Sequence, residues 1–238
     1  MEKAATESRF EDPLTYLPRK PLQEYARGRV IYDQQQPSGS LYLVVSGRVK
    51  VATTAEDGCQ TIVRIVASEG LFGESAMLGK EARPEQAAAL ETVNLMAWTA
   101  AEIEQQIERE PKLGIALAQC LVERCIELQD RIESMAFYKT PERVAIALMQ
   151  LAGSLGQTMP DGMVRVPSLT HHVIAEYVGT SREIVTFQMN RLRRLGMLQY
   201  SRRSIDVNTA AVEESLRSNG VTTSLGMREP DRARRVGG

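Results

Sequence analysis

Several residue types are scarce in this 238-residue chain, and each shortage excludes a class of protein. The two histidines, His171 and His172, are neighbours. A histidine catalytic triad, a cupin-type metal centre and a histidine-ligated haem in the first 170 residues are therefore excluded, and we expect no enzyme and no metal site. The three cysteines, Cys59, Cys120 and Cys125, form no paired framework. This pattern is typical of the reducing cytoplasm, where we expect the protein to reside.

Long apolar runs and aromatic residues are also lacking. No stretch reaches the ~18 apolar residues that a membrane-spanning helix needs, so we expect no membrane partner. The polar, acidic first residues do not resemble a secretory signal. Aromatic residues make up 5% of the chain against 43% hydrophobic residues in all, so the core must be mostly aliphatic. The length predicts one large domain or two small ones.

The pattern of apolar residues changes at Thr99. From residue 28 to 98, short apolar runs recur about every ten residues between glycine- and proline-containing turns, which predicts a small antiparallel roll. Residues 112–138 instead place apolar side chains at steps of three and four, which predicts one helix ~40 Å long. Two apolar stripes run along it, so one face can pack on the roll while the other favours a parallel dimer. A helix buried within a monomer is the alternative.

The remaining elements are helical with short strands. Thr140 and Pro141 predict the start of a helix that reaches residue 155, with Thr140 as its N-cap. Two helices within 170–196 and a strand pair around Arg202 and Arg203 follow. The predicted organisation is an irregular arm (1–19), a roll (20–110), a long helix (111–139), a helical domain with strands (140–220) and a disordered tail (221–238).

Residues 170–195 fit a helix-turn-helix. Ala175 is small where the two helices cross, and Gly179 stands at the turn, where a positive φ is needed. Val178, Ile184 and Val185 are the expected apolar contacts between the helices. Ser181, Arg182 and Glu183 open the second helix, whose first residues face base edges in DNA-binding motifs of this kind. Arg182 can contact a guanine in two-point fashion, and Glu183 can accept from a cytosine amine.

The charge distribution supports this interpretation. Residues 166–204 contain six arginines and two glutamates, a net charge of +4, although the whole chain carries −1. The rest of the chain must therefore carry −5. A basic module on an acidic body attracts phosphate without general adhesion to polyanions. An amphipathic helix pair without function is the alternative.

Three motifs together resemble the CRP/FNR superfamily, the cyclic-AMP receptor protein and its relatives. Residues 41–49 (LYLVVSGRV) resemble the central roll strands of that family, and 71–78 (LFGESAML) its phosphate-binding cassette. Residues 179–185 (GTSREIV) resemble the start of its recognition helix. The resemblance covers about residues 20–210. It implies an α+β fold with an N-terminal double-stranded β-roll of cyclic-nucleotide-binding type, a long dimerisation helix and a C-terminal winged helix-turn-helix.

The resemblance implies a homodimeric transcription regulator with double-stranded DNA and RNA polymerase as partners. Family readers often carry an arginine one turn after the Arg-Glu pair, but Phe187 stands there in this chain. Two interpretations stay open for Phe187, a contact with a thymine methyl or packing within the domain. The implied DNA contacts are Thr170, His171, Ser181, Arg182, Glu183, Thr186, Phe187, Gln188 and, on the wing, Arg202 and Arg203.

The resemblance also implies an effector pocket built from Gly73, Glu74 and Arg83, with positions 128 and 129 of the long helix beside it. In the family the glutamate holds a ribose hydroxyl and the arginine a cyclic phosphate. Here Pro84 replaces a serine, and Leu128 and Gln129 replace a Thr-Ser pair that contacts adenine. These departures argue against cyclic AMP and leave the cofactor unknown. The alternatives are another cyclic nucleotide, another metabolite, a constitutive DNA binder, or a cupin-type metal domain fused to a DNA-binding module.

Overall fold

The computed structural model describes residues 10–37, 39–79 and 82–221, so the predicted tail at 222–238 and the first part of the predicted arm lie outside the described residues. The chain divides into two compact units. The first contains Met1–Val51 and Ser68–Gln129, and the second contains Ala52–Ala67 and Asp130–Gly238. The division falls inside the long helix, between Gln129 and Asp130.

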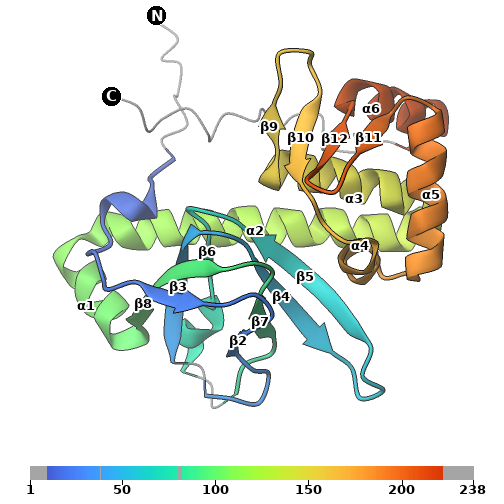
Figure 1. The fold of residues 1–238 in the computed structure, drawn as a ribbon. Helices are drawn as coiled ribbons and strands as arrows, with labels where there is room; N and C mark the ends of the chain where they lie inside the picture. The colour runs from blue at the N-terminus through green and yellow to red at the C-terminus, as the bar shows by residue number, and fades with distance from the viewer. Residues whose placement is uncertain (1–9, 38, 80–81, 222–238) are drawn as a thin grey trace, which may run out of the picture. The chain divides into compact units, whose positions relative to one another are not determined.

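The strands of the roll form two four-stranded sheets, as the ten-residue spacing predicted (Figure 1). One has the order β1 (Gln23–Tyr25), β8 (Val93–Thr99), β3 (Ser40–Ser46), β6 (Leu71–Phe72). The other has the order β2 (Val30–Tyr32), β7 (Gln86–Ala89), β4 (Val49–Thr54), β5 (Gln60–Val66). A 3-10 helix, η2 (Glu74–Leu78), follows β6. Alternation of buried and exposed side chains along these strands places the aliphatic residues inside.

The predicted arm contains regular structure, which corrects the sequence-based expectation. A 3-10 helix, η1 (Pro13–Thr15), begins where the Asp12 carboxylate accepts a hydrogen bond from Leu14 N at 2.9 Å. Leu14 and Leu17 pack against the core cluster that contains Trp98, whose indole N–H donates to Pro18 O at 2.9 Å. Pro13 at the first helical position starts this turn, because its fixed φ suits a helix start.

Two helices follow the roll. Helix α1 (Ala100–Arg109) begins with a capping box between Thr99 and Glu102. Helix α2 (Pro111–Phe137) has 27 residues and confirms the long predicted helix. Eight large apolar side chains along α2 are exposed: Ile115, Leu121, Val122, Ile126, Leu128, Ile132, Met135 and Phe137. None of the helices in the described part of the chain is both long and apolar enough to cross a membrane.

The second unit holds the winged helix-turn-helix. Helix α3 (Thr140–Leu155) has Lys139 rather than Thr140 at its N-cap, one residue before the prediction. A sheet has the order β11 (Leu198–Tyr200), β12 (Ser204–Val207), β10 (Val164–Pro167), β9 (Gln157–Thr158), and it packs against α3 and α5 (Arg182–Arg194). Helix α4 (His171–Val178) packs against α3 and α5, and α6 (Thr209–Ser218) packs against α3. Figure 1 shows α5 beside the strand β11. The predicted α+β class, with roll, long helix and winged helix-turn-helix, is confirmed.

Candidate DNA interface and effector pocket

The turn between α4 and α5 has the geometry that its residues predicted. Gly179 ends α4 with φ 72°, a conformation that favours glycine, and its N–H donates to Ala175 O at 2.9 Å. The Ser181 hydroxyl caps α5 by accepting from Ile184 N at 3.3 Å. Ala175, Val178 and Val185 are buried as predicted, whereas Ile184 is 41% exposed and does not join the helix contact.

The first turn of α5 carries two charged side chains into solvent. Arg182 and Glu183 are both exposed. Hydrogen bonds from the backbone N–H of Glu183 and from the Ser181 hydroxyl hold the pKa of the Glu183 carboxyl below its usual range. Its carboxylate is therefore ionised and is a hydrogen-bond acceptor, which is the form that a cytosine amine requires.

Thr186, Phe187 and Gln188 of α5, all named from the sequence as DNA contacts, differ in orientation. The Thr186 hydroxyl donates to Arg182 O at 2.8 Å and lies 2.8 Å from His171 Nδ1. Gln188 is 8% exposed, so its side chain belongs to the interior and not to the outer face. Phe187 is 61% exposed. Gln188 lies three residues after the buried Val185, and residues three apart share one face of a helix. This spacing could have predicted from the sequence that Gln188 is buried.

His171 lies at the start of α4 and is half-buried. Its ring meets the Tyr200 ring edge-on at 5.7 Å between centroids. Burial, and secondarily the positive Arg182, lower the pKa of His171 below its usual value. Because the Thr186 hydroxyl donates to Arg182 O, it accepts from His171, which places a hydrogen on Nδ1 of the ring. This contact ties the N-terminus of α4 to the second turn of α5.

A surface hollow of about 490 Å³ lies next to this contact. Its lining includes Thr170, His171, Arg182, Tyr200 and Ser201, so the start of α4, the start of α5 and the wing meet around it. The Thr170 hydroxyl accepts from Val173 N at 3.2 Å and caps α4. Thr170 and Ser181 are thus the N-caps of α4 and α5, so each side chain lies at the N-terminus of its helix.

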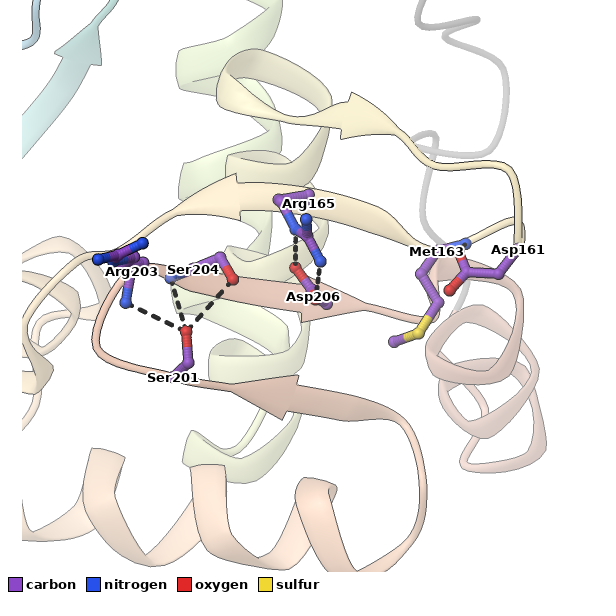
Figure 2. A network of polar contacts seen from close by, with 7 residues as sticks. All are labelled: Asp161, Met163, Arg165, Ser201, Arg203, Ser204 and Asp206. Atoms are coloured by element: carbon purple, nitrogen blue, oxygen red, sulfur yellow. Dashed lines mark hydrogen bonds and ion pairs between the residues drawn. The ribbon is translucent and has the colours of Figure 1, made fainter.

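The tip of the wing is a tight turn that presents two arginines. Figure 2 shows the Ser201 hydroxyl accepting from the backbone N–H groups of Arg203 and Ser204, at 3.1 and 3.2 Å. Arg202 and Arg203 are both exposed at this turn. Their exposure matches the placement of backbone phosphate contacts inferred from the sequence.

An ion pair joins β10 to β12, the strand that follows this turn. Arg165 on β10 donates from Nε and Nη2 to the two oxygens of Asp206 on β12, at 2.8 and 2.7 Å (Figure 2). The pair holds the pKa of Asp206 below its usual range. Because the two residues face each other across the ladder, the pair fixes the register of the wing strands.

Two arginines that the sequence did not single out hold the C-terminus of α4. Arg131 donates through Nη2 to Tyr177 O at 2.8 Å and through Nη1 to Ile62 O and Val63 O, each at 2.7 Å. Arg143 donates to Val178 O and, at 3.1 Å, to Gly179 O. Cations at the carboxyl end of a helix satisfy its last carbonyls, so both arginines fix the turn that precedes α5.

In the other unit, Arg83 is the centre of the predicted effector pocket. Its side chain is 3% exposed and donates to Ser40 O at 2.6 Å and to Gly73 O at 3.3 Å. Its guanidinium stacks on the Tyr32 ring, with Cζ 3.8 Å from the centroid. Gly73 has φ 84°, and a Cβ there would come within 2.9 Å of both Arg83 Nη1 and Ser40 O. Glycine is therefore required at this position both by its backbone and by the approach of the arginine.

Two carboxylates accompany Arg83. Glu74 follows Gly73 directly, and Glu85 lies two residues after the arginine. One oxygen of Glu85 accepts from the hydroxyls of Tyr32 and Ser75, each at 3.3 Å, and burial raises the pKa of Glu85 above its usual value. Pro84 between Arg83 and Glu85 has no N–H. The surroundings of Arg83 thus include a second acidic group, and position 84 supplies no backbone donor.

The residues of the predicted pocket differ in burial. Gly73 and Arg83 touch directly, with Ser75 beside them. Leu128 and Gln129 are exposed on α2. The residues that sequence reasoning missed are Tyr32 and Tyr42, which stack with Phe72 at centroid distances of 5.1 to 6.0 Å. Their aromatic side chains, in a chain with few aromatic residues, were the feature of the sequence that could have marked them.

Comparisons with known proteins agree with this architecture. Residues 22–110 match the cyclic nucleotide-binding domain, and residues 142–211 match the Crp-like helix-turn-helix domain. The chain is 32% identical over 164 residues to the transcriptional regulator SdrP of Thermus thermophilus, covering 68% of this chain and 76% of that protein. It is 29% identical over 203 residues to a cyclic AMP receptor protein of the same organism, covering 85% of this chain and 89% of that protein.

Solved structures lead to the same result. TTHA1359, a transcriptional regulator of the CRP/FNR family from Thermus thermophilus, superposes with a TM-score of 0.65 at 29% identity, over 82% of this chain and 97% of that one. FixK2 from Bradyrhizobium japonicum gives a TM-score of 0.73 at 18% identity, over 82% and 96%, and supports the fold alone. The matched helix-turn-helix domain and the named relatives define a DNA-binding transcription regulator, not an enzyme. The chain belongs to the CRP/FNR family.

Proposed function

We propose that this regulator acts in the cytoplasm as a homodimer that reads near-palindromic operators. The observation that carries the proposal is the row of exposed apolar side chains along α2, among them Val122 at 59% and Ile126 at 43% exposed. Contiguous apolar surface of this kind favours a protein partner, and a second α2 in parallel is the economical one. A two-fold dimer places two copies of α5 about one DNA turn apart, ~34–36 Å.

Within each half-site, Arg182 and Glu183 are the proposed base readers. Arg182 suits the O6 and N7 edge of a guanine, and the ionised Glu183 accepts from a cytosine N4 amine. Arg202 and Arg203 at the wing tip, with Thr170, His171 and Ser181 at the helix starts, lie where they can approach backbone phosphates. RNA polymerase is the further proposed partner, by family resemblance.

A double variant on α2 tests the dimer. Val122→Glu with Ile126→Glu should give a monomer by sedimentation and a loss of operator affinity, because two carboxylates per chain would be buried without partners. Gln105→Glu on α1 adds a charge at an exposed position and is the control, with unchanged sedimentation and DNA binding. A double variant that stays dimeric and binds DNA normally would refute the proposed interface.

We further propose that cyclic AMP does not control this protein, although two relatives are named as cyclic-AMP-activated or as cyclic AMP receptor proteins. Both terminal nitrogens of Arg83 already donate to protein carbonyls, and the guanidinium is stacked on Tyr32. Glu85 adds negative charge, and Pro84 supplies no N–H. A cyclic phosphate would have to compete with Gly73 O and Ser40 O for both terminal nitrogens of Arg83, because among the guanidinium nitrogens Nε alone has no hydrogen-bond partner. A nearby carboxylate further opposes the binding of an anion.

Calorimetry with cyclic AMP, cyclic GMP and cyclic di-GMP, with operator affinity measured alongside, tests this part. We expect no heat of binding for cyclic AMP and the same operator affinity with and without it. Saturable binding of cyclic AMP that raises operator affinity would overturn the proposal and restore the behaviour implied by the family.

A further inference from the structure

In the second turn of α5, the most exposed side chain is the apolar Phe187 and not a polar neighbour. Of the three neighbours Thr186, Phe187 and Gln188, the structure leaves one on the outer face. The Thr186 hydroxyl is engaged by Arg182 O and His171, each at 2.8 Å, and Gln188 is 8% exposed. Phe187 is 61% exposed, which excludes packing as its role within one chain.

Phe187 lies on the same face as the proposed base readers. It follows Glu183 by four residues and precedes Arg191 by four, so all three lie along one side of the helix. Glu183 and Arg191 are exposed as well. The side chain one turn further on, Asn190, accepts from the Tyr200 hydroxyl at 2.8 Å and so is turned toward the wing. A phenyl ring therefore stands in the middle of a polar reading face.

We propose that Phe187 is a specificity-determining residue that contacts the C5-methyl group of a thymine in each half-site. This inference rests on the proposed function, because it requires the outer face of α5 to enter the major groove. A phenyl ring has no hydrogen-bond donor or acceptor, so it gains nothing from the polar edges of the bases. The thymine methyl is the apolar group that unmodified base pairs display in the major groove.

The helical spacing also predicts where this thymine lies. Phe187 is four residues, about 6 Å, beyond Glu183 along the axis of α5. It therefore contacts a base pair different from the one that Arg182 reads, within the same half-site. The operator should contain a G·C pair with a thymine at a fixed distance from it, and the two preferences should be separable by mutation.

Selection from a duplex pool with a randomised centre is the first test. The full-length wild-type chain should enrich half-sites with both the G·C pair and the thymine. Phe187→Ala should enrich the same G·C pair and lose the thymine. Leu195→Ala removes another exposed apolar side chain, at the end of the same helix, and should select as the wild type does. A Phe187→Ala variant that still enriches the thymine would overturn the inference.

A second measurement isolates the methyl group. In the selected duplex, uracil replaces the thymine and removes one methyl without changing base pairing. The wild type should lose about four-fold in affinity per substituted half-site, as expected for one buried carbon group. Phe187→Ala should bind the two duplexes equally. An equal loss for both proteins would show that the methyl acts through DNA shape and would contradict a contact with Phe187.

The failure of the proposed function has a different signature. If the wild type enriched no sequence at all, the outer face of α5 would not be a reading face, and the inference would fail with the proposal. If the wild type and Phe187→Ala enriched the same G·C pair without any thymine, the proposed function would stand and the inference alone would be refuted.

Discussion

Two arginines, one in each unit, carry the same charge in opposite surroundings. Arg83 in the roll is 3% exposed, donates to Ser40 O and Gly73 O, and is covered by Tyr32. Arg182 at the start of α5 is exposed. A guanidinium whose terminal donors are already used by backbone carbonyls stabilises the fold, whereas an exposed one exchanges water for a ligand at small cost.

Residues that match a family motif can differ in burial and in contacts. Gly73, Glu74 and Arg83 all match the family cassette, and Arg83 is buried with its two terminal nitrogens on the carbonyls of Ser40 and Gly73. The motif at Ser181, Arg182 and Glu183 also matches, and there the side chains remain turned outward. Contacts and burial distinguish the two cases.

The largest effect is expected from removing the buried arginine. Arg83→Leu should lower the free energy of unfolding by at least about 2 kcal/mol, because the carbonyls of Ser40 and Gly73 lose their donor. The melting temperature should fall by about 5 °C or more. Arg29→Leu, at an exposed position of the same unit, should change stability by less than about 0.5 kcal/mol. An unchanged melting temperature for Arg83→Leu would return this arginine to a ligand-binding role.

An intermediate effect is expected from the exposed arginines of the second unit. Arg182→Ala should cost about 1–3 kcal/mol of operator binding and relax the preference at one G·C pair. Arg203→Ala on the wing should weaken selected and random duplexes alike and reduce the salt dependence of binding. Fluorescence anisotropy on both duplexes at several salt concentrations separates the two. Equal losses on both duplexes for Arg182→Ala would remove it from base recognition.

Local chemistry allowed much of the fold to be predicted. The caps at Thr170 and Ser181 and the left-handed Gly179 follow from short-range rules, and the steps of three and four along 112–138 define α2. The turn at Pro13 was missed because a single 3-10 turn has no periodicity, and only packing of Leu14 and Leu17 on the core stabilises it.

The candidate sites were predicted less completely, because their partners are distant in sequence. The contact of Arg131 with Ile62 O and Tyr177 O joins residues 69 and 46 positions apart, and no local pattern encodes it. The stacking of Arg83 on Tyr32 likewise depends on the pairing of β2 with β7. The residue types of the cassette can be read along the chain, whereas its internal hydrogen bonds required the fold.

The smallest expected effect is a pH dependence of stability that arises from His171. This side chain is partly buried, unlike the exposed arginines of the same unit. Burial and Arg182 lower its pKa in the folded chain. As the pH falls below about 6.5, the unfolded chain binds a proton on this histidine before the folded chain does, so stability decreases. At higher pH both states are neutral, and the penalty is absent.

His171→Gln should flatten this part of the stability profile, measured as melting temperature between about pH 8 and 5.5, above the range where most carboxylates titrate. His172→Gln is the control: His172 is exposed, its Nε2 lies 3.2 Å from Glu176 Oε1, and this variant should keep the wild-type decrease. Direct titration of the His171 ring by NMR should give a midpoint below that of a free histidine. A midpoint above it would contradict the lowered pKa and would remove His171 as the source of the loss of stability at low pH.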